Sequence, residues 1–286
     1  MFSVPTGRVD AVVLEAKYPH VFRIGLYNRA ATAAAIAGAA GLLLFGLYWL
    51  GFSLGQILSG LGELGRLIML MLPPDPGPWT RVLIYVNALG ETLAIAMLGT
   101  CGAAALAFPL SFLAARNAIP IWLVRFLARR SFDTLRGVDT LIWALIWVNV
   151  VGLGPFAGVL AIISSDLGSF GKLFSEAIEA AERQPVEAIT AAGGSRLHAI
   201  RFGLMPQVLP VMASQVLYYI ESNTRSATII GIVGAGGIGL HLYEQIRTLE
   251  WQAVAFITLM ILVTVAVIDL LSAKLRFAII GRKRTG

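Results

Sequence analysis

Long uncharged stretches of apolar residues dominate the chain and indicate its fold class. Four of them, residues 30–52, 92–115, 140–165 and 251–268, each contain 18 or more residues without a charge. A helix crosses the roughly 30 Å hydrocarbon core of a bilayer with about 20 residues. The pattern therefore predicts an all-α integral membrane protein.

Polar positions and chain breakers divide these stretches into six predicted transmembrane helices. They are residues 30–52, 84–114, 133–151, 155–171, 204–224 and 251–273. Around Gly152, Gly154 and Pro155 the chain either kinks one long helix or turns in a tight hairpin. Residues 53–83 are typical of a helix in the outer interface followed by a stiff proline-rich loop, and a short seventh span is the alternative.

The charge distribution favours the hairpin and orients the chain. Only 13% of the residues are charged, about half the share of a soluble domain, and the mean hydropathy is +0.79. With six spans, 18 of the 22 Lys and Arg residues lie on one side, which the positive-inside rule identifies as the cytoplasm. Residues 1–29 and 281–286 are then cytoplasmic tails. The net charge of +6 reflects these cytoplasmic segments, so no nucleic-acid partner is predicted.

The string "GAGGIG" at residues 234–239 has the G-x-G-x-x-G spacing of a dinucleotide-binding turn. Such a turn needs a βαβ unit and an acidic residue about 20 positions further on, but that distance falls inside an apolar run. Irregular backbone at membrane depth is tolerated where it is buried in protein or lines a wet cavity. We therefore predict that Gly234, Gly236, Gly237 and Gly239 shape a re-entrant segment beside a pathway and bind no cofactor.

The remaining chemistry of the chain predicts neither catalytic residues nor a metal site. The single cysteine, Cys101, and three scattered histidines do not make a ligand set, and Cys101 is expected to pack between helices. The chain contains neither H-E-x-x-H nor the G-x-x-x-x-G-K-[ST] phosphate-binding loop. Any ATP-driven work must therefore come from a partner.

A polar run, "YYIESNTRSAT", interrupts the fifth predicted span. Glu221 and Arg225 lie four residues apart, so they either pair with each other or line a pathway for a charged solute. An anion on that pathway would bind Arg225. Its neutral hydrogen-bond donors would be Asn223, Ser226 and Thr228. Weaker pathway candidates are Asn87, Glu91 and Asn149, and Asp269 is expected near the inner end of the sixth span.

The cytoplasmic loop of residues 172–203 contains a second predicted helix. Pro185 suits the first position of a helix, and residues 186–192 form a short alanine-rich run that ends at Gly193 and Gly194. A short helix with small exposed residues can seat in a groove of a partner protein, whereas the alternative is an ordinary solvated loop helix.

The spacing of Glu187–Ala188, Gly193 and Pro206 resembles the E-A-A…G…P signature of permease subunits of bacterial ABC importers. Ile189 stands where that family often has alanine, and residues 203–205 replace its usual Ile-x-Leu. The resemblance implies that this loop forms the coupling helix that docks onto an ATPase subunit. The implied docking residues are Glu187, Ala188, Ala191, Gly193, Gly194 and Ser195.

Five further stretches are similar to the phosphonate permease branch of this superfamily, over roughly residues 84–280. They are "LGTCGAAALAFPLSFLAARN", "VVGLGPFAGVLA", "GSFGKLFSEAIE", "IRFGLMPQVLP" and "ESNTRSATIIGIVGAGGIG". The related methionine-importer branch also carries a G-x-G-G-[IL]-G string, so the glycines do not choose the substrate.

The resemblance implies a type I core of five helices, residues 84–280, preceded by one extra helix. It also implies a homodimer in the bacterial cytoplasmic membrane, with two cytoplasmic ATPase subunits that bind ATP and Mg²⁺ and a solute-binding protein outside. The implied cargo is a phosphonate, phosphite or phosphate. Another small solute, such as an amino acid, and an ion-coupled secondary transporter are the alternatives.

Overall fold

The computed structural model of the protein describes residues 26–281, so residues 1–25 and 282–286 of the predicted tails lie outside it. All regular elements in the described range are helices, which confirms the all-α prediction there. Contacts divide the chain into two units, Met1–Arg66 and Leu67–Gly286. The first unit contains α3 (Leu26–Trp49) and most of α4 (Leu54–Leu70).

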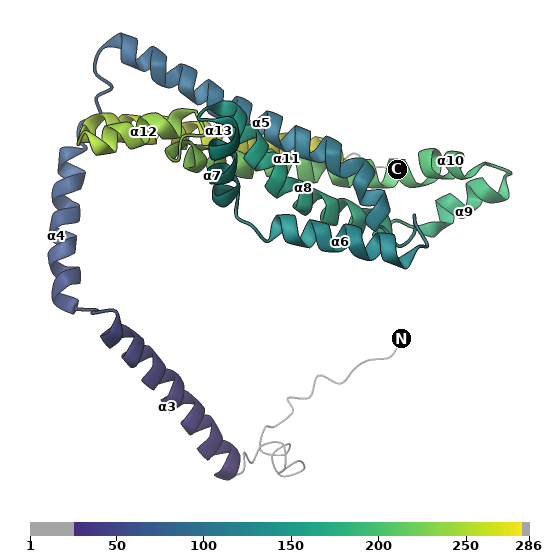
Figure 1. Ribbon diagram of the computed structural model, residues 1–286, viewed down its shortest axis with the longest axis horizontal. Helices are drawn as coiled ribbons and strands as arrows, with labels where there is room; N and C mark the ends of the chain where they lie inside the picture. The colour runs from purple at the N-terminus through teal and green to yellow at the C-terminus, as the bar shows by residue number, and fades with distance from the viewer. Residues whose placement is uncertain (1–25, 282–286) are drawn as a thin grey trace, which may run out of the picture. The chain divides into compact units, whose positions relative to one another are not determined.

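The second unit contains the remaining helices (Figure 1). They are α5 (Trp79–Ala114), α6 (Trp122–Arg136), α7 (Thr140–Val151), α8 (Pro155–Ala180), α9 (Arg183–Ala191), α10 (Arg196–His198), the π-helix η1 (Ala199–Leu204), α11 (Met205–Ile232), α12 (Ile238–Arg247) and α13 (Trp251–Gly281). Helix α8 packs against α5, α6 and α7, and α11 packs against α5, α12 and α13.

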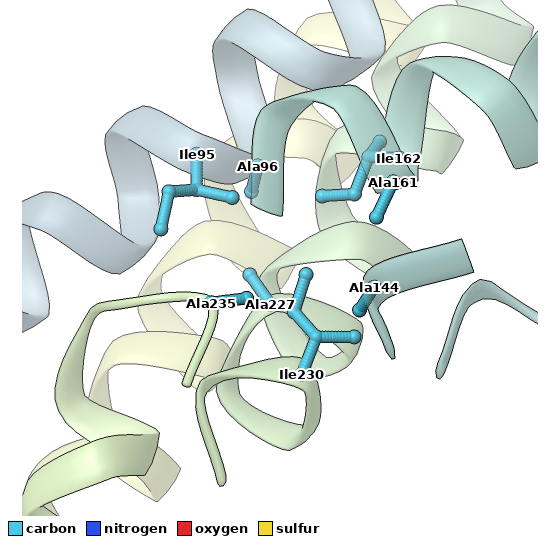
Figure 2. Close-up of a cluster of buried hydrophobic side chains, with 8 residues drawn as sticks. All are labelled: Ile95, Ala96, Ala144, Ala161, Ile162, Ala227, Ile230 and Ala235. Carbon is cyan, nitrogen blue, oxygen red and sulfur yellow. The ribbon is translucent and has the colours of Figure 1, made fainter. Parts of the chain in front are cut away.

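Small residues allow the central helices to approach closely. A β-carbon on Gly99 of α5 would lie 2.7 Å from Ile162 of α8, so the two helices cross at this glycine. A β-carbon on Gly171 of α8 would lie 2.5 Å from the ring of Phe132, the buried residue of α6. Figure 2 shows the buried cluster where α5, α7, α8 and α11 meet, in which five of eight side chains are alanines. The cluster consists of Ile95, Ala96, Ala144, Ala161, Ile162, Ala227, Ile230 and Ala235.

Among the described helices, four are long and apolar enough to cross a membrane, and the number rises to five if α6 and α7 count as one bent span. The four segments are Ala30–Trp49, Trp79–Ala114, Pro155–Ala180 and Trp251–Ala278. Helix α11 is long enough with 28 residues, but its polar run from 221 to 226 lowers its hydropathy. Length and composition alone therefore do not reach the predicted six.

The predicted uninterrupted helix over residues 133–151 is wrong. Helix α6 ends at Arg136, and α7 starts at Thr140 after a bend of 87°. The carboxylate of Asp139 accepts a hydrogen bond from the Leu141 amide (2.8 Å) and so caps α7. The predicted break after Val151 is confirmed, because α7 ends there and α8 begins at Pro155 and packs against it.

Two further expectations need adjustment. Cys101 is exposed on α5 instead of packed between helices, because Thr100 and Ala103 belong to the buried face of that helix and residue 101 does not. Helices α8, α11 and α13 also extend beyond the predicted spans, since a helix continues past the membrane as long as its sequence permits. The interfacial position of residues 53–83 stays a prediction.

Candidate functional site

Helix α9 is largely exposed: none of its residues is buried, and only Pro185, Val186 and Ile189 are partly buried. It begins at Arg183, two residues before the proline that was predicted to start it. Pro185 is tolerated there because the first four amides of a helix have no intrahelical acceptor. The helix ends at Ala191, and Gly193 adopts a left-handed conformation (φ +84°) that favours glycine.

The residues predicted to dock an ATPase lie on and directly after α9. Gly194 is partly buried, and a β-carbon there would lie 2.7 Å from the Ile189 carbonyl oxygen. Ser195 caps the next short helix, because its hydroxyl accepts a hydrogen bond from the His198 amide (3.4 Å). Apart from Gly194, all the predicted docking residues are exposed. They are Glu187, Ala188, Ala191, Gly193 and Ser195.

A cleft of about 530 Å³ opens beside α9. The ends of α5 and α8, α9 and η1 all contribute to it, so its shape depends on how these elements sit together. Its lining combines apolar side chains such as Phe112 and Ile200 with polar ones such as Asn117, Glu187 and Thr190. A concave surface of mixed character next to an exposed helix suits the docking of a segment from another protein.

Side-chain hydrogen bonds fasten this loop to the membrane helices. Gln207, in the first turn of α11, donates to the Gly203 carbonyl (2.7 Å) and exchanges hydrogen bonds with the backbone of Glu182. Arg196 donates to the Ala118 carbonyl (2.8 Å). These bonds connect the loop that contains α9 to α11 and to the chain that follows α5.

Glu179 near the end of α8 forms a second set of contacts, which joins the ends of neighbouring helices. Its carboxylate pairs with the Arg129 guanidinium of α6 (2.6 Å) and accepts a hydrogen bond from the Arg116 amide (2.6 Å). Arg129 also donates to the Ala114 carbonyl at the end of α5 (3.0 Å). These contacts hold the ends of α5, α6 and α8 together next to the cleft.

The glycine string forms a buried turn between α11 and α12. Gly234, Gly236 and Gly237 have φ values of +94°, +83° and +76°, and all six residues of the string are buried. The turn is bonded to two other parts of the bundle, because Gly154 N donates to Gly234 O (2.9 Å) and Ile238 N donates to the Thr92 hydroxyl (2.8 Å).

Protein atoms fill the space around this turn. A β-carbon on Gly239 would collide with the Thr228 carbonyl oxygen of α11, and one on Gly237 would collide with the Thr92 hydroxyl. No strand precedes the string in the described range, so the βαβ unit of a dinucleotide site is absent there. The role of the glycines beside a pathway stays a prediction.

The neutral polar side chains of α11 that were predicted as donors donate their hydrogen bonds to acceptors inside the protein. Asn223 is 4% exposed, and its amide donates to the Thr100 hydroxyl (2.8 Å) and to the Asp166 carboxylate (2.5 Å). Ser226 and Thr228 donate to carbonyls one turn earlier in their own helix. Asn223 thus links α5, α8 and α11, and of the predicted neutral donors none has a hydrogen free for a solute in this arrangement.

The charged residues of α11 do meet. Arg225 pairs with Glu221 (3.5 Å), which is the pairing alternative from the sequence, yet its side chain remains 49% exposed. Glu221 also pairs with Arg276 of α13 (3.2 Å). Sequence reasoning assigned Arg276 to the basic cytoplasmic end, and no local spacing links two residues that lie 55 positions apart.

Among the described contacts, none joins the weaker pathway candidates to the charged residues of α11. Asn87, Asn149 and Asp269 are exposed, and the Asn149 amide donates to the Leu145 carbonyl of its own helix. Glu91 is partly buried, and its carboxylate lies against the glycine turn.

Comparisons with known proteins show the family to which this chain belongs. Residues 107–280 match a family model described as the binding-protein-dependent transport system inner membrane component. The chain belongs to this family of transport permeases. The resemblance to ABC importer permeases is thereby confirmed.

Relatives of this permease include two proteins of Stutzerimonas stutzeri. HtxC, which carries the name of a phosphite transport system permease protein, is 41% identical over 229 residues, or 80% of each chain. The phosphite transport system permease protein PtxC is 37% identical over 242 residues, which are 84% of this chain and 87% of PtxC. Among solved structures, a chain of the MetNI methionine ABC transporter in inward-facing conformations has a TM-score of 0.61, with 16% identity over 71% of this permease and 99% of that chain. This likeness shows the fold.

Proposed function

We propose that this permease forms the translocation pathway of an ATP-driven importer for a phosphorus oxyanion, namely a phosphonate, phosphite or phosphate. Helix α9 carries the proposal, because a largely exposed helix that lies beside a cleft and is hydrogen-bonded to α11 through Glu182 and Gln207 is suited to receive movement from a partner. Two relatives named for phosphite transport, and the similarity to the phosphonate branch, support the cargo class. A half-exposed arginine in α11 provides a suitable charge.

The proposed assembly contains two copies of the permease in the bacterial cytoplasmic membrane. Six helices cross it, with α6 and α7 as one bent span and α11 as a span that its polar run makes less apolar. Both termini are cytoplasmic. Each α9 contacts one ATPase subunit, which binds ATP and Mg²⁺, so the permease itself catalyses no reaction. A solute-binding protein delivers the anion from the outer side.

Movement at α9 would reach the pathway through the fastening residues. Gln207, in the first turn of α11, holds Glu182 at the start of α9, and Arg225 lies five turns further along α11. Glu179 couples the same end of the molecule to α5 and α6. Transport requires that ATP and the loaded binding protein each favour one of two conformations.

Reconstitution in liposomes tests this function. The permease with its co-encoded ATPase and the loaded solute-binding protein is expected to accumulate labelled phosphite, phosphate or methylphosphonate only when ATP is supplied. Uptake by the permease alone, driven by a proton or sodium gradient, would favour the secondary-transporter alternative. ATP-dependent uptake of an amino acid without any of the three anions would replace the cargo class but keep the importer.

Site-directed labelling tests the orientation. Cys101 is exposed and is first removed as Cys101→Ser. A single Ala188→Cys in that background, expressed without the ATPase so that the proposed docking surface stays uncovered, is expected to react with a membrane-impermeant maleimide only after the cells are permeabilised. Labelling of intact cells from outside would overturn the cytoplasmic position of α9.

A further inference from the structure

Two arginines from different helices meet on one buried carboxylate. Glu221 of α11 is 9% exposed. Its Oε1 lies 3.5 Å from Nη1 of Arg225 on the same helix, and its Oε2 lies 3.2 Å from Nη2 of Arg276 on α13. Within the described part of the chain, Glu221 is the one carboxylate that forms an ion pair with either arginine. The group of three therefore has one positive charge in excess.

The two arginines are held differently. Arg276 is 25% exposed and joins α13 to α11, so its ion pair is supported by the packing of two helices. Arg225 is 49% exposed, and its 3.5 Å separation from Glu221 is longer than the 3.2 Å of the Arg276 pair. Arg225 is therefore the partner that can be exchanged.

Whether Arg225 can leave Glu221 depends on Arg276. A buried carboxylate without a counter-ion is strongly unfavourable. With Arg276 in place, Glu221 keeps a counter-ion when Arg225 turns away. Without Arg276, Glu221 would have Arg225 as its remaining counter-ion and would hold it.

We propose that Arg276 is a positioning residue, which leaves Arg225 free to bind the passing phosphorus oxyanion; this inference rests on the function proposed above. A phosphorus oxyanion offers several oxygens to the planar fork of a guanidinium. Its negative charge also balances the one excess positive charge of the group. Because Glu221 keeps Arg276 occupied, the anion meets one available arginine instead of two and is not held tightly.

A double-mutant cycle in the complete transporter tests this role. The complex of permease, ATPase and solute-binding protein is reconstituted with Arg276→Gln, with Glu221→Gln and with both changes. The probe is whichever of phosphite, phosphate and methylphosphonate the wild-type complex transports. Two quantities are measured, namely the uptake rate and the ATP hydrolysed per anion transported. Glutamine keeps much of the side-chain stem and limits the loss of packing.

Arg276→Gln is expected to lower uptake on the order of tenfold, a common size of coupling between contacting charged residues. ATP hydrolysis continues, so more ATP is used per anion. The double variant is expected to transport faster than Arg276→Gln alone, because an uncharged residue 221 no longer holds Arg225. A conservative Arg276→Lys keeps the counter-ion and should retain most uptake. The matched control is Arg66→Gln, which breaks the exposed pair with Glu63 in α4 and should leave uptake unchanged.

The outcomes separate this inference from the proposed function. Uptake by Arg276→Gln equal to that of the wild type overturns the positioning role and leaves the importer intact. Uptake is compared per folded complex, because neutralising Glu221 also relieves the cost of an unpaired buried carboxylate. A double variant that is no faster than Arg276→Gln on this basis overturns the positioning role, because neutralising residue 221 should release Arg225. Wild-type complexes that transport none of the three anions overturn the cargo class and, with it, this role for Arg276.

Discussion

The glycine turn between α11 and α12 has no room for a side chain, so Gly236→Ala should destabilise the permease. A β-carbon at this position would lie 2.6 Å from the Glu91 carboxylate and 2.9 Å from the Pro155 backbone nitrogen. The Glu91 side chain can swing away, but the backbone at the start of α8 cannot move without shifting that helix. The left-handed φ of +83° costs a residue with a β-carbon about 1–2 kcal/mol. Overpacking adds about 1–3 kcal/mol, so the total is about 2–5 kcal/mol.

Substitutions at two other glycines distinguish the energetic cost of backbone strain from that of crowding. Gly152 has a φ of +93° but no atom within 4 Å of its β-carbon position, so Gly152→Ala carries the backbone cost alone. Gly90 within α5 has open space and ordinary helical geometry, so Gly90→Ala should not destabilise. Thermal unfolding of the purified permease in detergent measures all three. Each kcal/mol is expected to lower the Tm by about 2–4 °C for a chain of this size.

The expected order of stability is Gly90→Ala, then Gly152→Ala, then Gly236→Ala. Equal melting temperatures for Gly90→Ala and Gly236→Ala would refute the reasoning, because they would mean that the turn accepts a β-carbon without cost. Uptake measured on the same variants then tells whether the turn also serves the pathway: a loss of transport by Gly236→Ala beyond its loss of folded protein would support that role.

Three further changes probe the loop and the bundle. Gly193→Leu should reduce co-purification of the ATPase with the permease, since a bulky left-handed residue distorts the end of α9 on its exposed side; unchanged yield of the complex would contradict docking there. Asn223→Ala removes the hydrogen bonds to Thr100 and to the buried Asp166, which should lower stability by about 1–3 kcal/mol, and a thermal melt equal to that of the wild type would show that these bonds contribute nothing. Glu179→Gln should lower uptake and ATPase stimulation together while leaving anion binding to the solute-binding protein intact, because it removes the ion pair with Arg129 that joins α6 to the end of α8; full coupling in this variant would remove Glu179 from the transmission of movement.

Much of the candidate site was readable in the sequence because its signals are local. The exposure of most of α9 follows from a short run of small and polar residues that ends at Gly193, in which Val186 and Ile189 alone form a narrow apolar side. The break between α7 and α8 follows from Gly152 and Gly154, whose φ values of +93° and +132° suit glycine. These features depend on residues close together in the chain.

The partners of the polar side chains could not be predicted from the sequence in the same way. Asn223 looked like a donor for a solute, yet Thr100 and Asp166 from two other helices take up its hydrogens. Arg276 looked like one more basic residue near a cytoplasmic end, yet α13 brings it to Glu221. The partners lie far away in the sequence, so the pattern around each residue contains no information about them.

The sequence by itself determined the membrane environment, the helical class and the family of this protein, because hydropathy, charge bias and motif spacing act over short stretches of chain. Only the tertiary structure decided which polar groups satisfy one another and which charge remains in excess. The physical reason is that a polar group buried among helices must find a partner across the bundle, and the choice depends on how the helices cross.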